Sequence, residues 1–302
     1  MANTTLRNTW TVARHELVDS IRSRRAIVLL ILYVLGAVAA TLLFVKLLHT
    51  LENQLEKAIG VAEAQKAGGT SSALWKNQMF KGMLSHVVGS DAAAIKLLSF
   101  TPLALFYGWI SFTFTPLLVI LMSSARISEE IWSGSVRFVM FRTSRLSWCA
   151  GKFAGQALQL LVALLLSALA AWVTGWFRLA FFAPLPNAID LLVFALKAWV
   201  YSIAFLGLAT GVSQAVASPN VATALGFVAM VVVGILHSIA SWVTMQPWRM
   251  ILETTDMMLP GGHQLDLWLT DAAHAVPAVL FVLCLGTAYA LAGYVSFSRR
   301  NL

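Results

Sequence analysis

Long apolar segments alternate with short charged ones along this chain. A helix needs about 20 apolar residues to cross the hydrocarbon core of a bilayer. Six segments reach that length, and we expect each to be a membrane-spanning helix. Their approximate bounds are 26–48, 102–123, 153–177, 189–216, 221–243 and 275–297. The pattern therefore predicts an all-α membrane protein.

The composition supports this fold class. Of 302 residues, 59% are hydrophobic and 11% are charged, whereas soluble domains carry about 25% charged residues. The net charge is +8, but the arginines lie beside the ends of apolar segments. Such clustering is typical of the positive-inside rule of membrane proteins, so we do not expect nucleic-acid binding.

Basic residues gather in three segments that six spans place on one side of the membrane: the N-terminal segment, the insert at 124–152 and the C-terminal end. Because cytoplasmic loops are rich in Lys and Arg, we expect this side and both termini to be cytoplasmic. The loop at 49–101 is then outside, with a helix of its own over 51–67. The outer segment 244–274 is expected to turn at Pro260-Gly261-Gly262.

The N-terminal segment 1–25 has the pattern of an amphipathic helix that lies in the membrane interface and leads into the first span. The residues on which this prediction rests are Trp10, Leu17, Ile21, Arg22, Arg24 and Arg25. A cytoplasmic helix packed on its own protein is the alternative interpretation.

The insert at 124–152 is too charged for lipid and too short for a domain. Its first part is expected to continue the second span as a helix that carries Glu129 and Glu130. Gly134 allows the backbone to turn, and Ser135 is expected to cap a second short helix. The insert is therefore predicted to lie across the cytoplasmic end of the spans, where it suits docking to another protein.

Four short motifs follow one another along the insert. They are Glu129-Glu130, Gly134-Ser135, Ser144-Arg145 and Gly151-Lys152. Their order resembles the loop between the second and third spans of type 2 ABC exporter permeases, which shows acidic residues, Gly-Thr, Pro-x-Ser-Arg and Gly-Lys. Here serine replaces the threonine and no proline precedes the Ser-Arg pair, so this loop enters its turn differently. The segment 1–25 resembles the elbow helix of the family.

The resemblance implies one permease domain over 1–302, in which the insert is a coupling helix that docks into a separate ATPase subunit. The coupling surface would consist of Glu129, Glu130, Gly134, Arg137 and Arg145. It also implies a second permease chain, identical or different, in a bacterial cytoplasmic membrane. Anchoring of the loop to lipid headgroups is the alternative role of these charges.

No catalytic motif accompanies the spans. The chain has no G-x-x-x-x-G-K-[ST] sequence, so ATP and Mg are expected on the partner, and this chain is expected to be non-catalytic and without a cofactor. A metal-cluster candidate in the outer segment consists of His263, Asp266, Asp271 and His274. Its spacing is not diagnostic, so no metal site is predicted.

Polar side chains within spans are costly, which makes them candidates for a translocation path. The candidates are Lys197, Gln156, Gln159 and His237. Lys197 lies roughly 12 Å into its span, where it snorkels outward, faces a path or pairs with Asp190. The other three alternatively make hydrogen bonds between helices.

Two series of small residues predict close helix packing within the chain: Gly207 with Gly211, and Gly286 with Ala290 and Gly293. Three classes of function stay open at this point. They are the permease subunit of an ATP-driven exporter, an ATP-independent transporter or channel, and a membrane scaffold that binds an extracytoplasmic partner. Substrate and direction of transport do not follow from the sequence.

Overall fold

The computed structural model describes residues 2–59, 95–179, 182–243, 247–269 and 272–300. Within these residues every regular element is a helix, and six helices are long and apolar enough to cross a membrane. The predicted all-α membrane protein with six spans is thereby confirmed. Residues 60–94, which make up most of the expected outer loop, lie outside the described part.

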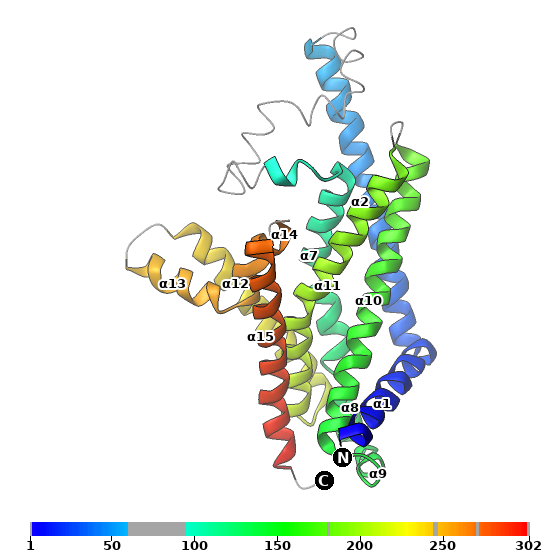
Figure 1. Ribbon diagram of the computed structural model, residues 1–302, viewed down its shortest axis with the longest axis vertical. Coiled ribbons are helices and arrows are strands. Elements are labelled where there is room, and N and C mark those ends of the chain that lie inside the picture. Colours follow the sequence, from blue (N-terminus) through cyan, green and yellow to red (C-terminus); the bar gives the residue numbers. More distant parts are fainter. Residues whose placement is uncertain (1, 60–94, 180–181, 244–246, 270–271, 301–302) are drawn as a thin grey trace.

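The spans form an elongated bundle with both chain ends at the same end (Figure 1). In chain order, the helices are α1 (Ala2–Arg22), α2 (Arg24–Ile59), α7 (Pro102–Ser123), α8 (Arg126–Trp132), α9 (Val136–Met140), α10 (Arg145–Arg178), α11 (Pro184–Ala215), α12 (Pro219–Trp242), α13 (Trp248–Met257), the 3-10 turn η1 (Pro260–His263), α14 (Gln264–Trp268) and α15 (Ala272–Ser298). Figure 1 shows α1, α8 and α9 beside the chain ends, and α13 projecting sideways.

Local sequence signals explain several helix starts. Proline stands in the first turn of α7, α11 and α12, where its missing N–H costs nothing. Helix α10 begins at Arg145 and not near 153, because the Ser144 hydroxyl accepts a hydrogen bond of 3.2 Å from the Ser147 amide. Ser135 takes the predicted N-cap position of α9, but its side chain makes no cap hydrogen bond.

In the segments expected to lie outside, one helix boundary differs and one predicted turn is confirmed. Helix α2 continues without a break to Ile59, so the start of the helix expected over 51–67 is an extension of the first span. A helix can continue through polar residues beyond its apolar segment, so the end of the apolar segment does not mark the end of the helix. At Pro260 the expected turn is a 3-10 turn that leads directly into α14.

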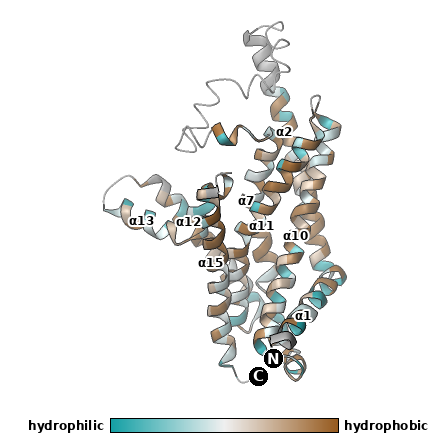
Figure 2. Cartoon of the chain, in the orientation of Figure 1, coloured by the Kyte–Doolittle hydropathy of each residue, from teal (hydrophilic) through white to brown (hydrophobic). Residues whose placement is uncertain are grey.

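Helix α11 is the centre of the bundle and packs against α7, α10 and α15. Of the residues in an apolar stretch of α11, 61% are buried, compared with 11% in the corresponding stretches of α2 and α12. Figure 2 colours much of α2 and α15 as hydrophobic, and large apolar residues of both helices, such as Leu32 and Leu280, are exposed, as expected for helices that face lipid.

Helices α11 and α15 approach each other closely at their glycines. A Cβ atom added to Gly207 would lie 1.9 Å from the carbonyl oxygen of Gly286, and one added to Gly293 would lie 2.4 Å from the Cα of Gly211. Only glycine leaves room for such backbone contact. The prediction that these glycines pack helices within the chain is confirmed.

Candidate functional site

The insert predicted to dock a partner folds as two short helices, α8 and α9, joined by a turn, and we call this element (126–141, with the C-cap residue of α9) the hairpin. The turn between them contains Gly134 with φ of +72°, a left-handed conformation that favours glycine. A Cβ atom at this position would meet nothing within 4 Å, so the conformation and not crowding explains the residue.

A small hydrophobic core supports this hairpin. It consists of Ile127, Val136, Trp148, Cys149 and Phe297 and thus joins α8, α9, α10 and α15. The rings of Trp148 and Phe297 stack with centroids 5.5 Å apart. Because these side chains are buried, the hairpin is held against the bundle.

Arg145 holds the C-terminal end of α15 in place. Its Nη1 donates to the carbonyl oxygens of Ser298, at 2.7 Å, and Arg300, at 3.1 Å. Its guanidinium also lies over the Phe297 ring, 5.8 Å from the centroid. The structure therefore gives Arg145 intramolecular partners, although it was predicted as part of a surface for another protein.

A buried ion-pair network lies behind the hairpin. The ammonium of Lys152, on α10, contacts the carboxylates of both Glu16, on α1, and Glu130, on α8. The side chains are 9%, 3% and 29% exposed, in that order. Since buried charges are stable only when paired, this triad ties α1 and α8 to α10.

Two further contacts hold α8 from other sides. Arg25, at the start of α2, forms an ion pair with Glu129 at 3.1 Å. The Ser213 hydroxyl on α11 accepts hydrogen bonds from the amides of Ile127, at 3.1 Å, and Ser128, at 3.0 Å. These amides belong to the first turn of α8 and have no intrahelical acceptor, so Ser213 caps the helix from a distance.

Helix α1 packs on α10 through its small and polar side chains. Ala13, Glu16 and Ser20 are buried, and Ser20 donates to the Gln159 side chain at 2.7 Å. Gly155 on α10 makes room, because a Cβ there would lie 2.7 Å from the Cβ of Glu16.

The predicted apolar face of α1 is divided, since Ala13 is buried against the protein whereas its larger side chains are exposed or half-buried. Trp10 and Ile21 are 62% and 73% exposed, and Leu17 is half-buried. Both interpretations of the segment thus describe part of it: one face packs on the protein, while the larger apolar side chains are left free for a membrane interface. The interfacial location itself stays a prediction.

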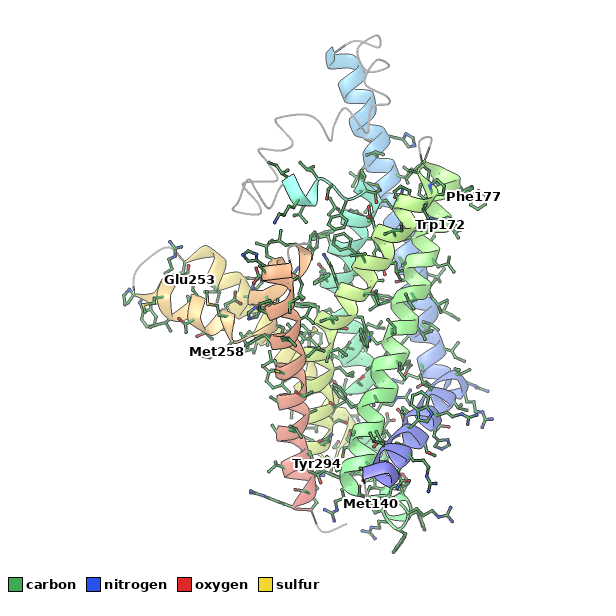
Figure 3. The ribbon with its side chains drawn as sticks, in the orientation of Figure 1. Met140, Trp172, Phe177, Glu253, Met258 and Tyr294 are labelled. Atoms are coloured by element: carbon green, nitrogen blue, oxygen red, sulfur yellow. The ribbon has the colours of Figure 1, made fainter. Side chains whose placement is uncertain are left out.

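Three aromatic side chains of the hairpin are strongly exposed. Trp132, Phe138 and Phe141 are 72%, 77% and 87% exposed, and we call these three residues the aromatic tip. Arg137 and Arg142 are exposed beside them. Figure 3 places Met140, which lies between two of them in sequence, at the same end of the molecule as the α15 residue Tyr294.

Lys197 lies near the opposite end, bonded to α14. Its Nζ donates to the carbonyl oxygens of Trp268, at 2.9 Å, and Leu269, at 3.2 Å. It also lies 5.4 Å from the centre of the Phe194 ring. The alternative in which Lys197 pairs with Asp190 is wrong, because no ion pair joins them in the described part of the chain, and the Asp190 carboxylate accepts from the Thr101 amide.

Two of the other three path candidates have hydrogen-bond partners on neighbouring helices. Gln159 bonds Ser20, and His237 lies 3.0 Å from Asp256 of α13. Gln156 is buried, and neither of its amide atoms has a hydrogen-bond partner among the described residues. The structure therefore ties Gln159 and His237 to neighbouring helices, and a path along these residues stays a prediction.

Asp190 has a capping role for α7 that can be tested. Its carboxylate accepts from the Thr101 amide at 2.7 Å, next to the first turn of α7. Asp190→Ala is expected to lower the free energy of unfolding by about 1–2 kcal/mol, as for other lost N-caps. Asp190→Asn keeps an oxygen acceptor and should lose less. Equal losses in SDS-titration unfolding would contradict the capping role.

Comparison with known proteins decides the family. A family model described as ABC-2 family transporter protein matches residues 10–302. The chain belongs to the ABC-2 transporter family. The resemblance noted in the insert is thereby confirmed, and the ABC-2 protein is a multi-pass membrane component of a transporter. No curated protein matches the chain.

Sequence reasoning about this ABC-2 protein missed three features of the hairpin. The Glu16–Lys152–Glu130 triad, the cap from Ser213 and the aromatic tip all depend on which helices are neighbours. A signal existed for the first, because Glu16 stands next to the apolar Leu17 and Lys152 stands directly before the predicted third span, and charges at such positions need a partner when they are buried. The metal-cluster candidate includes Asp271, which lies outside the described residues.

Proposed function

We propose that this ABC-2 protein is the membrane-spanning subunit of an ATP-driven exporter and that a separate ATPase subunit docks on the aromatic tip. The observation that supports the proposal most is the extreme exposure of Trp132, Phe138 and Phe141 on a hairpin whose inner side is held rigidly.

The chemistry of this surface suits a protein partner. Aromatic and arginine side chains are the residues that most often dominate binding energy in protein interfaces. Exposed aromatic rings at a charged, non-spanning end of the bundle lose contact with water when a partner groove covers them. Gly134 shapes the turn that presents these rings, while Arg137 and Arg142 supply charge beside them.

The inner contacts give a route for force from the partner to the spans. A push on α8 would act on α10 and α1 through Lys152, on α2 through Arg25 and on α11 through Ser213. In this proposal Glu129 and Glu130 transmit movement inward and do not themselves bind the ATPase. Packed elements with few empty spaces move as units, which suits mechanical coupling.

The complete transporter in this proposal contains further chains. Helices α2 and α12 bury little of their apolar surface within the chain, which leaves area for lipid and for a second permease chain. ATP and Mg would bind the ATPase subunits, so the end with both chain termini would face the cytoplasm of a bacterial cell. The outer segments around α13 would be the place for an extracytoplasmic partner.

The docking role is tested by copurification with a co-expressed ATPase subunit. The double variant Phe138→Ser and Phe141→Ser is expected to bind the ATPase about 30-fold or more weakly, as when a hot-spot aromatic is lost. The matched control is Phe177→Ser, because Phe177 is 78% exposed but lies at the opposite end of the molecule (Figure 3). Unchanged copurification of the double variant would refute docking at the aromatic tip.

A further inference from the structure

A cavity of about 320 Å³ opens between α2 and α7, close to where α2 begins. Its lining is mostly hydrocarbon, and two of its five lining residues are arginines. The lining residues are Arg24, Arg25, Val28, Leu29 and Leu121.

The two guanidinium groups of the cavity differ in their partners. Arg25 is positioned by Glu129, at 3.1 Å, and by the carbonyl oxygen of Leu121, at 3.3 Å. Arg24 is exposed and has no ion pair or side-chain hydrogen bond within the described residues. Two positive charges thus share one carboxylate, which leaves an excess positive charge at the mouth of the cavity.

The remaining wall of the cavity is aliphatic and continues along α2. Val28 lines the cavity and is exposed. Farther along the helix, Ile31, Leu32 and Leu35 are also exposed. Helix α2 is long and apolar enough to span a membrane, so hydrocarbon chains of lipid surround this strip. An occupant of the cavity therefore meets arginine at one end and lipid-facing aliphatic surface at the other.

We propose that this cavity is a binding site for an anionic phospholipid. The phosphate pairs with Arg24 and Arg25, and the first part of the acyl chains lies against Val28, Leu29 and Leu121. Basic pockets between spanning helices are known to bind lipid headgroups, and guanidinium matches phosphate geometry. A free phosphate would use only the two guanidinium groups, so the aliphatic wall favours the intact lipid.

The shared ion pair gives the proposal a distinctive consequence. The lipid phosphate competes with Glu129 for Arg25, since both acceptors need the same guanidinium. Removal of the Glu129 charge is therefore expected to strengthen lipid binding. A role of Glu129 that is only structural would not produce a gain.

The test uses the full chain in nanodiscs of equal parts phosphatidylcholine and phosphatidylglycerol, with native mass spectrometry to count retained lipids. Arg24→Gln is expected to reduce retained phosphatidylglycerol about fivefold, the effect of one basic residue near an anionic surface. Glu129→Gln should increase it, and Val28→Trp should reduce it by filling the cavity. Arg14→Gln makes the same charge change away from the cavity and should retain the wild-type amount.

Three outcomes would overturn the proposal. Equal losses in Arg24→Gln and Arg14→Gln would show general charge attraction, and a loss in Glu129→Gln would contradict competition for Arg25. Displacement of the lipid by millimolar soluble glycerol phosphate would show that the aliphatic wall contributes nothing. Size-exclusion chromatography of each variant checks folding, and Arg24 and Glu129 are exposed enough for their variants to keep the test informative if Val28→Trp does not fold.

Discussion

Replacing Lys152 with methionine is expected to lower the free energy of unfolding by about 3–5 kcal/mol, because two carboxylates would be left in the protein without their cation. Glu16 is 3% exposed and Glu130 is 29% exposed, so water cannot replace the ammonium fully at either group. The loss should appear in SDS-titration unfolding of the purified chain.

The triple variant Lys152→Met, Glu16→Gln and Glu130→Gln separates charge from shape. Replacing a buried ion network by uncharged groups is often nearly neutral, so this variant should regain most of the lost stability. The exposed pair Arg249–Glu253 on α13 has an N–O distance of 2.7 Å and is the matched control. Arg249→Met should change stability little, as is common for surface pairs. If the Lys152→Met variant were as stable as the Arg249→Met control, the triad would not stabilise the packing of α1 and α8 on α10.

Replacing Gly207 with valine is expected to destabilise the protein by about 3 kcal/mol, because added side-chain atoms would force apart two helix backbones. The added Cβ would lie 1.9 Å from the Gly286 carbonyl oxygen, and backbone cannot move aside as a flexible side chain can. Gly286→Val should act similarly, since its Cβ would lie 2.5 Å from the Ile203 carbonyl oxygen.

Gly36 and Gly234 are the matched controls for the helix contact. Each stands in a spanning helix, but an added Cβ meets nothing within 4 Å. Alanine there should be neutral or should stabilise by up to about 1 kcal/mol, because alanine favours a helix more than glycine does. The measurement is the same SDS titration. If Gly207→Val were as stable as these two variants, the α11–α15 contact would not be as close as described.

The number of the membrane spans and their helical type could be predicted from sequence for a simple reason. A spanning helix satisfies its own backbone hydrogen bonds and needs about 20 apolar residues, so its signal is local. Helix ends were less predictable. Helix α10 begins at Arg145 and α2 continues to Ile59, because charged residues can extend a helix beyond the apolar segment.

The candidate site shows the same division. The turn at Gly134 was predictable because glycine allows the backbone to turn, and the family was predictable because the motif order of the insert resembles it. The partners of the acids on α8 were not predictable. Glu130 contacts Lys152 on the following span, and Glu129 contacts Arg25, which is 104 residues away in sequence. Such pairs depend on which helices are neighbours and on how each helix is rotated about its axis, and composition determines neither.

The sequence by itself determined that this protein is an all-α, six-span member of an ABC permease class, since hydrophobic length and local motifs carry that information. Only the tertiary structure decided which charges face inward and which rings face outward on the hairpin. It paired Glu16 with Lys152, turned Phe141 to the surface and formed the cavity at Arg24. The physical reason is that burial and ion pairing depend on contacts between segments far apart in the chain.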